Sequence, residues 1–500
     1  MNSPATGGDS GTAAAPSGPL TVEQYLRVVL DDVPAPEPAT LPLAECAGLV
    51  LAAEITAKLP VPPFTNSAMD GFAVRIADLE GTGAAATVTL PVSADIPAGT
   101  APGPLAPGTA ARIMTGAPVP EGADAVVPVE DTDSAPGPRP CPGTISVPTR
   151  VRAGAHIRPA GEDVGVGDLV LRAGEELTAA ALASAASIGH GELPVFPRPR
   201  VAVVATGAEL VAPGQTPGPG QIPDSNAILL TTLARGWGAD VTVVRASGDT
   251  ADELAEALAR GAADADVVVT SGGISAGAFD PVKTLVAEGR ADIGFHKLRQ
   301  QPGGPQACGR VGGGGGEANK GEGSDGHASP AVLLGLPGNP VSVFVSAILY
   351  LRPLLMKLAG FGDGRNVGTQ TGETDAEASP ATSPAPATSP APRDFTAAAP
   401  ELPGLGTIAV TADAEFRARR GKRRFVPVTV TGGRARPVHE LGIGSHLIAS
   451  LHAANALLVL PEAGGAMPGG DTAPDVFSPG DRLAAIPIDP ALRRGKDRHS

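Results

Sequence analysis

The sequence predicts a multidomain protein of the α/β plus β class. A parallel-sheet domain follows N-terminal helical and β domains and precedes a small C-terminal β domain. The chain has 500 residues, which suggests roughly three or four domains at about 150 residues each. Residues 197–361 alternate valine-rich strands with helical stretches. The segments on both sides contain short apolar runs separated by Pro and Gly, which is typical of β domains.

The first domains are predicted from a change of pattern near residue 60. Residues 1–20 have low complexity and lack the basic and apolar regions of a signal peptide, so we expect a disordered tail. A helix is expected to begin near Thr21, and residues 21–59 with 149–196 are expected to form a discontinuous N-terminal linker or helical domain. Residues 60–148 contain the short apolar runs of a β domain.

The α/β domain is predicted over residues 197–361. Its strands read "RVAVVA", "VTVVRA", "VVVT" and "AVLLGL", and a helical stretch follows each one. Valine-rich strands that alternate with helices predict a parallel sheet covered on both faces. Residues 309–330 are glycine-rich, and we expect a flexible insertion between two strands. A Pro-rich linker over 362–400 leads to the C-terminal β domain of residues 401–490.

Composition argues against several classes of function. The net charge of −15 argues against a nucleic-acid-binding surface. Cys46, Cys141 and Cys308 are odd in number and far apart, which argues against a disulfide framework or a zinc site. The apolar run from Val341 to Leu351 is shorter than the roughly 20 residues that a membrane span needs. We therefore expect a cytoplasmic protein with neither nucleic-acid nor membrane partners.

Four loops follow strands of the α/β domain and are rich in glycine or small polar residues. In open parallel sheets, ligands bind beyond the carboxyl ends of the strands. Glycines let the backbone approach a ligand, and successive free N–H groups can bind an anion. A tight turn explains any single loop, but four loops at one edge favour a site for a phosphorylated ligand. The loops are Thr206–Leu210, Ser247–Asp249, Ser271–Asp280 and Gly335–Pro340.

Charged residues near these loops suggest how phosphates could be held. Glu209, Asp249 and Asp280 each follow a strand end. Carboxylates around phosphates repel them unless a divalent cation lies between, and Mg²⁺ takes one or two carboxylates with phosphate oxygens and waters. Helix capping explains Asp249 and Asp280 equally well, and the two roles are compatible. Lys297 is either a cation that neutralises phosphate or a solvated lysine at a strand end.

Other segments give weaker signals. Asp70 lies in an Asp-Gly turn and Thr115 lies at a corner between two strands, so neither reveals chemistry by itself. The basic run Arg417–Phe425 is either a solvated hairpin or a rim that contacts phosphate. The sequence shows no Ser-His-Asp triad, no metal-ligand spacing of histidines and no complete P-loop motif.

Taken in order, the motifs between about Thr21 and Pro487 resemble those of the molybdopterin molybdenumtransferase family, which includes MoeA and the E domain of gephyrin. The resemblance implies that the α/β domain binds molybdopterin. It also implies an elongated homodimer, with its cleft between the α/β domain of one subunit and β domains of the other. The matching segments are "NSAMDGFAV", "RIMTGAPVPEGADAVV", "GED", "VAVVATGAEL", "DSN", "TSGGISAG", "GLPGNPVS" and "GSHLIASLHAANAL".

The reaction implied by this resemblance places molybdenum from molybdate on the dithiolene of adenylylated molybdopterin and releases AMP, with Mg²⁺ as the cation. Other enzymes of cofactor biosynthesis would be further partners. Motif matches assign roles to individual residues. The implied catalytic residues are Asp70, Thr115, Asp163, Lys297 and Ser445; the substrate-binding residues are Ser225, Asn226, Ser271, Gly272, Gly273, Ser275, Gly338, Asn339 and Pro340; and the metal ligands are Glu209, Asp249 and Asp280.

One segment departs from the family pattern. The family usually has "PGKP" after the site lysine, whereas this chain has "QQPGGP", with Gln301 and Gly304. Loss of positive charge beside an anionic ligand should weaken phosphate or molybdate binding, and Arg299 is a candidate for compensation. Two alternatives therefore stay open: a pterin-binding or scaffold paralogue without turnover, and a molybdopterin adenylyltransferase-like enzyme. The intact carboxylates argue against the first, and the matching segments outside the α/β domain argue against the second.

Overall fold

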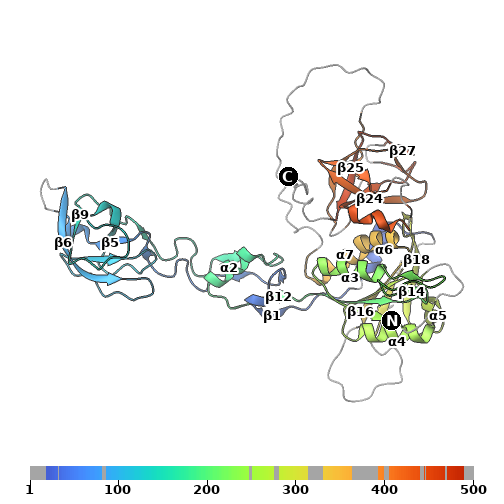
Figure 1. Cartoon of the computed structure of the whole chain (residues 1–500), viewed down its shortest axis with the longest axis horizontal. Helices are drawn as coiled ribbons and strands as arrows, with labels where there is room; N and C mark the ends of the chain where they lie inside the picture. The colour runs from blue at the N-terminus through green and yellow to red at the C-terminus, as the bar shows by residue number, and fades with distance from the viewer. Residues whose placement is uncertain are drawn as a thin grey trace, which may run out of the picture. The chain divides into compact units, whose positions relative to one another are not determined.

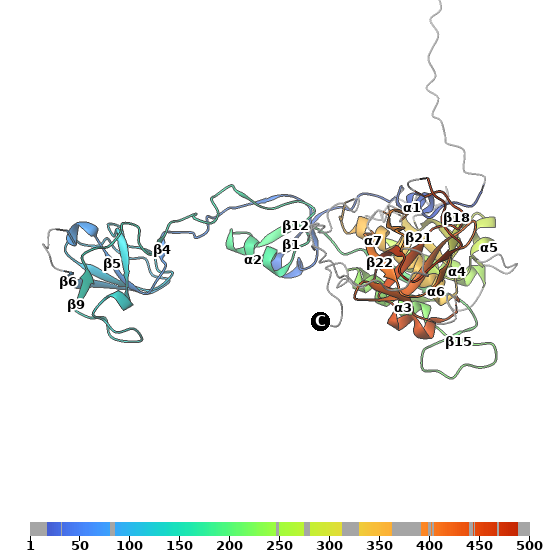
Figure 2. The same ribbon diagram turned by 90° about the horizontal axis from the view of Figure 1, so that it is seen from above.

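The computed structural model divides the chain into two compact units. Unit 1 contains Met1–Pro38 and Phe196–Ser500, and unit 2 contains Ala39–Val195 (Figures 1 and 2). Most of the expected tail, insertion and linker (1–20, 309–330 and 362–400) lie outside the described residues. The structure describes residues 18–31, 33–80, 86–246, 250–274, 281–312, 330–362, 392–398, 402, 405–439, 444, 446–467 and 470–488.

A six-stranded sheet forms the centre of the α/β domain in unit 1. Its order is β16-β13-β17-β21-β20-β18, and the first four strands are parallel, which confirms the predicted parallel sheet. Strand β20 pairs antiparallel with both β21 and β18 and so extends the sheet on one side. The strands are β13 (Arg200–Ala205), β16 (Asp240–Arg245), β17 (Val267–Ser271), β18 (Asp292–Lys297), β20 (Pro305–Val311) and β21 (Ala331–Leu336).

Helices cover both faces of this sheet, because alternate strand residues point to opposite sides. Val201 and Val203 of β13 pack into one core, whereas Ala202 and Val204 pack into the other. Figure 1 shows α4 and α5 on the opposite face from α3 and α6. The helices are α3 (Asn226–Gly236), α4 (Ala251–Ala262), α5 (Pro281–Ala287), α6 (Pro340–Ser346) and α7 (Arg352–Leu358), and the π-helical segment η4 (Ala347–Leu351) joins the last two.

The helical stretch Pro340–Leu358 is long and apolar enough to cross a membrane by length and composition. However, 89% of its apolar window is buried within the protein. Tyr350 and Leu354 are among its fully buried side chains. A central helix of an α/β domain is buried on most sides, and this burial explains why the stretch is so apolar.

The first helix, α1 (Val22–Asp31), belongs to the core of unit 1. The predicted N-terminal domain of residues 21–59 and 149–196 included this helix, whereas in the structure the helix packs within unit 1. Its buried residues Val22, Tyr25, Leu26 and Val29 follow the spacing of one helix face, and they pack with the α/β domain. The backbone N–H of Leu20 also donates to the carbonyl of Lys297, at 2.9 Å, which fixes the start of the helix beside β18 (Figure 2).

The C-terminal β domain of unit 1 contains a second six-stranded sheet, of order β19-β24-β25-β22-β28-β26. The first strand comes from the α/β domain, so the sheet joins segments far apart in sequence. Its core has its own apolar cluster, and Phe425, Leu457 and Ile486 reach the core of the α/β domain. The elements are β19 (Gln300–Gln301), β22 (Ile408–Ala412), β23 (Phe416–Arg417), β24 (Arg423–Thr431), β25 (Arg434–Pro437), β26 (Ala456–Leu460), β27 (Val476–Phe477) and β28 (Arg482–Pro487), with the 3-10 segments η5 (Thr396–Ala398) and η6 (Ile448–Ala453).

Unit 2 contains a five-stranded sheet and a three-stranded sheet, each packed on apolar clusters, together with two short two-stranded sheets. The larger sheet has the order β8-β5-β7-β6-β9 and covers the region predicted as a β domain. The smaller sheet, β1-β12-β2, packs with α2 (Ala179–Ser187). The strands are β1 (Ala39–Pro42), β2 (Val50–Leu51), β3 (Ile55–Thr56), β4 (Asn66–Ser67), β5 (Gly71–Val74), β6 (Thr87–Ile96), β7 (Ala110–Ile113), β8 (Ala125–Pro128), β9 (Thr144–Pro148), β10 (Ile157–Arg158), β11 (Leu169–Leu171) and β12 (Glu192–Phe196), with short 3-10 turns η1 (Leu43–Glu45), η2 (Ile76–Asp78) and η3 (Val129–Asp131).

Gly71 should be essential to the larger sheet. A Cβ atom at this position would lie 2.0 Å from the carbonyl oxygen of Val127 in the neighbouring strand. We expect Gly71→Ala to destabilise unit 2 by about 1–3 kcal/mol, because the strands must separate to admit the methyl group. Gly143→Ala is the matched control, since a Cβ there would meet no atom within 4 Å. Denaturation followed by circular dichroism should separate the two variants, and equal stability would contradict this packing.

Candidate functional site

A pocket lies at the carboxyl ends of parallel strands β13, β17 and β21, the edge that open parallel sheets use for ligands. Its volume is about 300 Å³. The short parallel strands β14 (Leu210–Val211) and β15 (Ile222–Pro223) form one side of it. The lining residues are Thr206, Gly207, Glu209, Leu210, Ile222, Pro223, Asp224, Ser225, Asn226, Ser271, Gly272, Gly273, Pro281, Gly338, Asn339 and Pro340.

Two glycine loops form the floor of the pocket. Gly272 and Gly273 follow β17 with φ of +93° and +70°, a left-handed conformation that side chains rarely adopt. The two loops pass close to each other, because a Cβ added to Gly338 would lie 3.6 Å from the Cα of Gly272, an ordinary van der Waals distance. The N–H of Gly272 donates to the carbonyl of Leu336 at 2.9 Å, which ties the end of β17 to the end of β21. Bare backbone therefore faces the cavity.

Glu209 brings a carboxylate into the pocket wall. Its Oε2 would lie 2.6 Å from a Cβ placed on Gly207, so the carboxylate folds over the Gly207 backbone. Gly207 has φ +136°, and any side chain there would both strain the backbone and displace the carboxylate. The position of Glu209 thus depends on a glycine two residues earlier.

The beginning of α3 forms another wall. The side-chain amide of Asn226 donates to the carbonyl of Gly338 at 2.7 Å, so this helix start is joined to the loop before α6. Ser225 precedes the helix, and its hydroxyl makes no capping hydrogen bond. Asn339 likewise precedes α6 without a side-chain capping bond. The polar groups of Ser225 and Asn339 are therefore not used to cap their own helices.

The pocket brings together the predicted substrate-binding residues with the exception of Ser275, which lies outside the described residues. Of the predicted metal ligands it includes Glu209, whereas Asp249 and Asp280 lie outside the described residues. Sequence reasoning did not assign a role to Asp224, a lining residue that is 1% exposed. It stands in the "DSN" segment beside two residues that were selected, so the signal was present in the sequence.

Lys297 lies at the same edge of the sheet but does not line the pocket. Lys297 is the last residue of β18 and pairs with Pro305 of β20. Strand β20 in turn pairs with β21, so Lys297 lies at about the same height in the sheet as the end of β21. One strand separates β18 from β21, so Lys297 is roughly 10 Å from the end of β21 at ordinary strand spacing. Its side chain is exposed. Ser445, the other catalytic candidate of unit 1, lies outside the described residues.

In unit 2, Asp70 and Thr115 are brought into direct contact. Oδ1 of Asp70 accepts a hydrogen bond from the Thr115 N–H at 2.7 Å and one from its hydroxyl at 2.8 Å. The backbone bond, followed by the hydroxyl bond, lowers the pKa of the exposed Asp70 carboxyl. Asp163 is exposed in the same unit, and its backbone N–H donates to the carbonyl of Val61 at 2.9 Å.

The "QQPGGP" turn packs against the basic run of the C-terminal domain, because β19 pairs with β24. Arg299 forms an ion pair with Glu462, so its charge is already balanced by a carboxylate. Lys422 lies closer than Arg299 to Gly304, one of the residues that differ from the family pattern. Its Nζ lies 3.9 Å from the position that a Cβ on Gly304 would take.

Two arginines of the basic run add to this positive surface. Arg419 donates to Oε1 of Gln301 at 3.1 Å. Burial, with the nearby positive charge of Arg419, lowers the pKa of Arg424. Within the described part of the chain, neither arginine nor Lys422 has a carboxylate oxygen within 4.0 Å, so the turn faces uncompensated positive charge.

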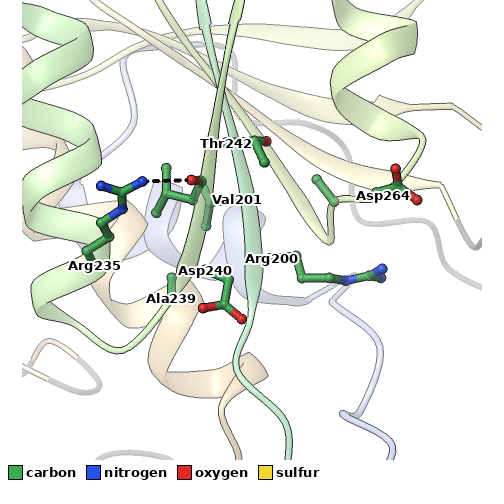
Figure 3. A pocket seen from close by; sticks show the side chains of 9 residues that line it. Arg200, Val201, Arg235, Ala239, Asp240, Thr242 and Asp264 are labelled. Atoms are coloured by element: carbon green, nitrogen blue, oxygen red, sulfur yellow. Dashed lines mark hydrogen bonds between the residues drawn. The ribbon is translucent and has the colours of Figure 1, made fainter.

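A second hollow, of about 500 Å³, opens at the opposite edge of the sheet. Figure 3 shows Arg200 and Asp240, which begin β13 and β16, together with Arg235, whose guanidinium donates to the Val241 carbonyl at 3.1 Å. This hollow lies at the amino ends of the strands and lacks the glycine loops. Despite its larger volume, it is therefore the weaker candidate.

The described residues contain no group of three or more His, Cys, Asp or Glu side chains that could hold a metal ion. Glu209 alone among the described residues was predicted as a metal ligand, and it supplies the oxygen donor that Mg²⁺ prefers. This donor fits a cation whose other ligands are substrate phosphates and waters, since Mg²⁺ often binds through one or two carboxylates in such sites.

The contact between Asp70 and Thr115 gives a testable pKa. Thr115→Val removes the hydroxyl donor and keeps the N–H, so we expect the Asp70 pKa to rise toward its ordinary value. Because the native pKa is depressed, the contact stabilises the protein above the unfolded pKa and is lost as pH falls through the native value. Carboxyl NMR titration measures the shift. Thr115→Ser, which keeps the donor, is the control, and an unchanged pKa in Thr115→Val would refute this assignment.

Three family models match successive parts of the chain. The model for the MoeA N-terminal region, domains I and II, matches residues 20–189. The model for the probable molybdopterin-binding domain matches residues 202–357, which contain the pocket. The model for the MoeA C-terminal region, domain IV, matches residues 409–474.

Relatives match over most of their length. Molybdopterin molybdenumtransferase 2 of Mycobacterium tuberculosis is 45% identical over 353 residues, which are 69% of this chain and 80% of the relative. The molybdopterin molybdenumtransferase of Haemophilus influenzae is 35% identical over 68% of this chain and 78% of its own. A crystal structure of a MoeA protein from Pyrococcus horikoshii is 25% identical with a TM-score of 0.68, covering 94% of this chain and all of that one. The chain belongs to the molybdopterin molybdenumtransferase family.

Proposed function

We propose that this protein inserts molybdenum into adenylylated molybdopterin and releases AMP, giving the molybdenum cofactor. The proposal rests chiefly on the glycine-lined pocket at the carboxyl edge of the sheet, in a chain of this family. Relatives that match over most of their length carry the name molybdopterin molybdenumtransferase. We place the reaction in the cytoplasm.

In this proposal the pocket binds the phosphorylated pterin. The backbone of Gly272, Gly273 and Gly338 admits the ligand closely, which side chains would prevent. Ser225 and Asn339 offer polar groups that their own helices do not use for capping. A pocket of about 300 Å³ suits part of the substrate rather than the whole adenylylated molecule.

Glu209, with Asp249 and Asp280, would hold Mg²⁺, and the chemistry that the ion would supply is charge compensation for the phosphates. Asp70, Thr115, Asp163, Lys297 and Ser445 are proposed to act at the metal-insertion step. The hydrogen bonds from Thr115 lower the pKa of Asp70 and so favour its anionic form, which suits it to orient a ligand by accepting hydrogen bonds. We propose a homodimer, which is the assembly that the family resemblance implies.

The scaffold alternative was motivated by lost positive charge at the "QQPGGP" turn. Lys422 and Arg419 place positive charge, without a carboxylate partner among the described residues, beside Gln301 and Gly304. This charge can replace the missing lysine, which favours an active enzyme over a scaffold. The adenylyltransferase-like alternative concerns the α/β domain alone. Matches at residues 20–189 and 409–474 argue against it.

The central test is AMP release from adenylylated molybdopterin with molybdate and Mg²⁺. We expect the wild-type chain to release AMP and form cofactor, and Asp280→Asn to lose activity by at least about 100-fold, because one metal ligand loses its charge. Asp240→Asn is the control: it removes one carboxylate at the amino end of β16, the opposite edge from the pocket. A folded wild-type protein without turnover would favour the scaffold, and normal turnover by Asp280→Asn would overturn the metal assignment.

Lys422 should be required for oxyanion affinity. We expect Lys422→Gln to raise the molybdate concentration for half-maximal activity about 3–10-fold, because it removes an unpaired cation beside Gly304. Steady-state kinetics with varied molybdate measure this change. Arg420→Gln removes the same charge from the same run at an exposed residue paired with Asp475, and it should have little effect. Equal effects of the two variants would reduce the role of Lys422 to general electrostatics.

A further inference from the structure

Asp224 is a buried carboxylate between the pocket and the edge strand β16. Its side chain is 1% exposed, and it lines the pocket at the end of β15. Oδ1 accepts a hydrogen bond from the N–H of Ala227 at 3.0 Å. Oδ2 is buried and makes no hydrogen bond to any described group. A buried carboxylate oxygen without a partner is costly, so the structure must balance this charge in another way.

Arg245, the last residue of β16, supplies the balancing charge. Its guanidinium lies 3.8 Å from Oδ2 of Asp224. The two side chains differ greatly in exposure, because that of Arg245 is 50% exposed. Removing Arg245 would leave a buried, uncompensated carboxylate, whereas removing the charge of Asp224 would leave a cation that water can solvate.

The hydrogen bond from Ala227 makes Asp224 the N-terminal cap of α3. Ser225 occupies the nominal capping position but does not use its hydroxyl there. The Asp224 N–H also donates to the carbonyl of Val211, at 2.9 Å, so β14 and the helix start are joined. Asn226, the first residue of α3, then reaches Gly338 across the pocket. The cap and the bond to Gly338 thus come from residues only two positions apart.

We propose that Asp224 and Arg245 are positioning residues for substrate binding. Asp224 holds the start of α3 so that Asn226 closes the pocket against Gly338, and Arg245 keeps the Asp224 carboxylate buried. Neither residue needs to touch the substrate. The proposal rests on the proposed function for its ligand, but it concerns this chain's own hydrogen bonds and charges.

The test measures affinity rather than turnover. Binding of adenylylated molybdopterin to each purified variant is measured by calorimetric titration, which gives the dissociation constant directly. We expect Arg245→Gln to weaken binding about tenfold. Without Arg245 the buried Asp224 carboxylate has no balancing charge, so the start of α3 should shift to expose it to water. In the double variant Asp224→Asn/Arg245→Gln, affinity should return to within about threefold of wild type, since Asn caps helices as well as Asp does.

Two further variants separate positioning from general stability. Asp224→Ala removes the cap, so its loss of affinity should persist when Arg245→Gln is added. Arg235→Gln is the control, an arginine of α3 whose guanidinium contacts the Val241 carbonyl instead of Asp224. Thermal unfolding of each variant is measured in parallel. A role confined to stability would lower the unfolding temperature and leave the affinity of the folded protein unchanged, which would overturn the proposal.

The proposal is also wrong if the double variant binds no better than Arg245→Gln. Failure of the proposed function has a different signature. In that case the wild-type chain itself would neither bind adenylylated molybdopterin nor release AMP, and the arginine and aspartate variants would not differ from it.

Discussion

The close approach of two backbones at the carboxyl edge of the parallel sheet is the constraint on which the site depends. Strands β17 and β21 are neighbours, and the loops that follow them meet at Gly272 and Gly338. Gly272 has a φ of +93°, a left-handed conformation that residues with side chains rarely adopt. The sheet places the loops, and the glycines leave a cavity bounded by backbone amides and by the start of α3.

Parallel pairing explains why so much of this site could be predicted from the sequence. Once strands are recognised by their valines, the carboxyl-edge rule brings loops separated by many residues to one place. Glu209, Ser225, Asn226 and the glycines followed from that rule and from the family resemblance. Helix α1 could not be placed in this way, because its apolar face would fit any core of suitable shape. Its position depends on packing with Tyr350 and its neighbours, which local sequence does not determine.

The role of Asp224 illustrates another limit of sequence reasoning. An aspartate before a helix predicts a cap, and this part of its role is visible in "DSN". Its dependence on Arg245 is not, because the two residues lie on different elements and meet only after β16 takes its place at the sheet edge. Long-range charge pairs of this kind follow from topology. A single sequence gives no period or spacing that would link them.

The basic run of the C-terminal domain shows the same principle for charge. In the sequence, "QQPGGP" lacks the lysine of the family pattern, whereas "RARRGKRRF" carries a dense run of positive charge with no evident role. The pairing of β19 with β24 places these two segments side by side, so that Lys422 approaches Gly304. Electrostatic interactions depend on distance in space, not on the segment that carries the charge. A cation missing from one strand can therefore be supplied by the strand paired with it, and a departure from a family motif has to be judged against the whole sheet.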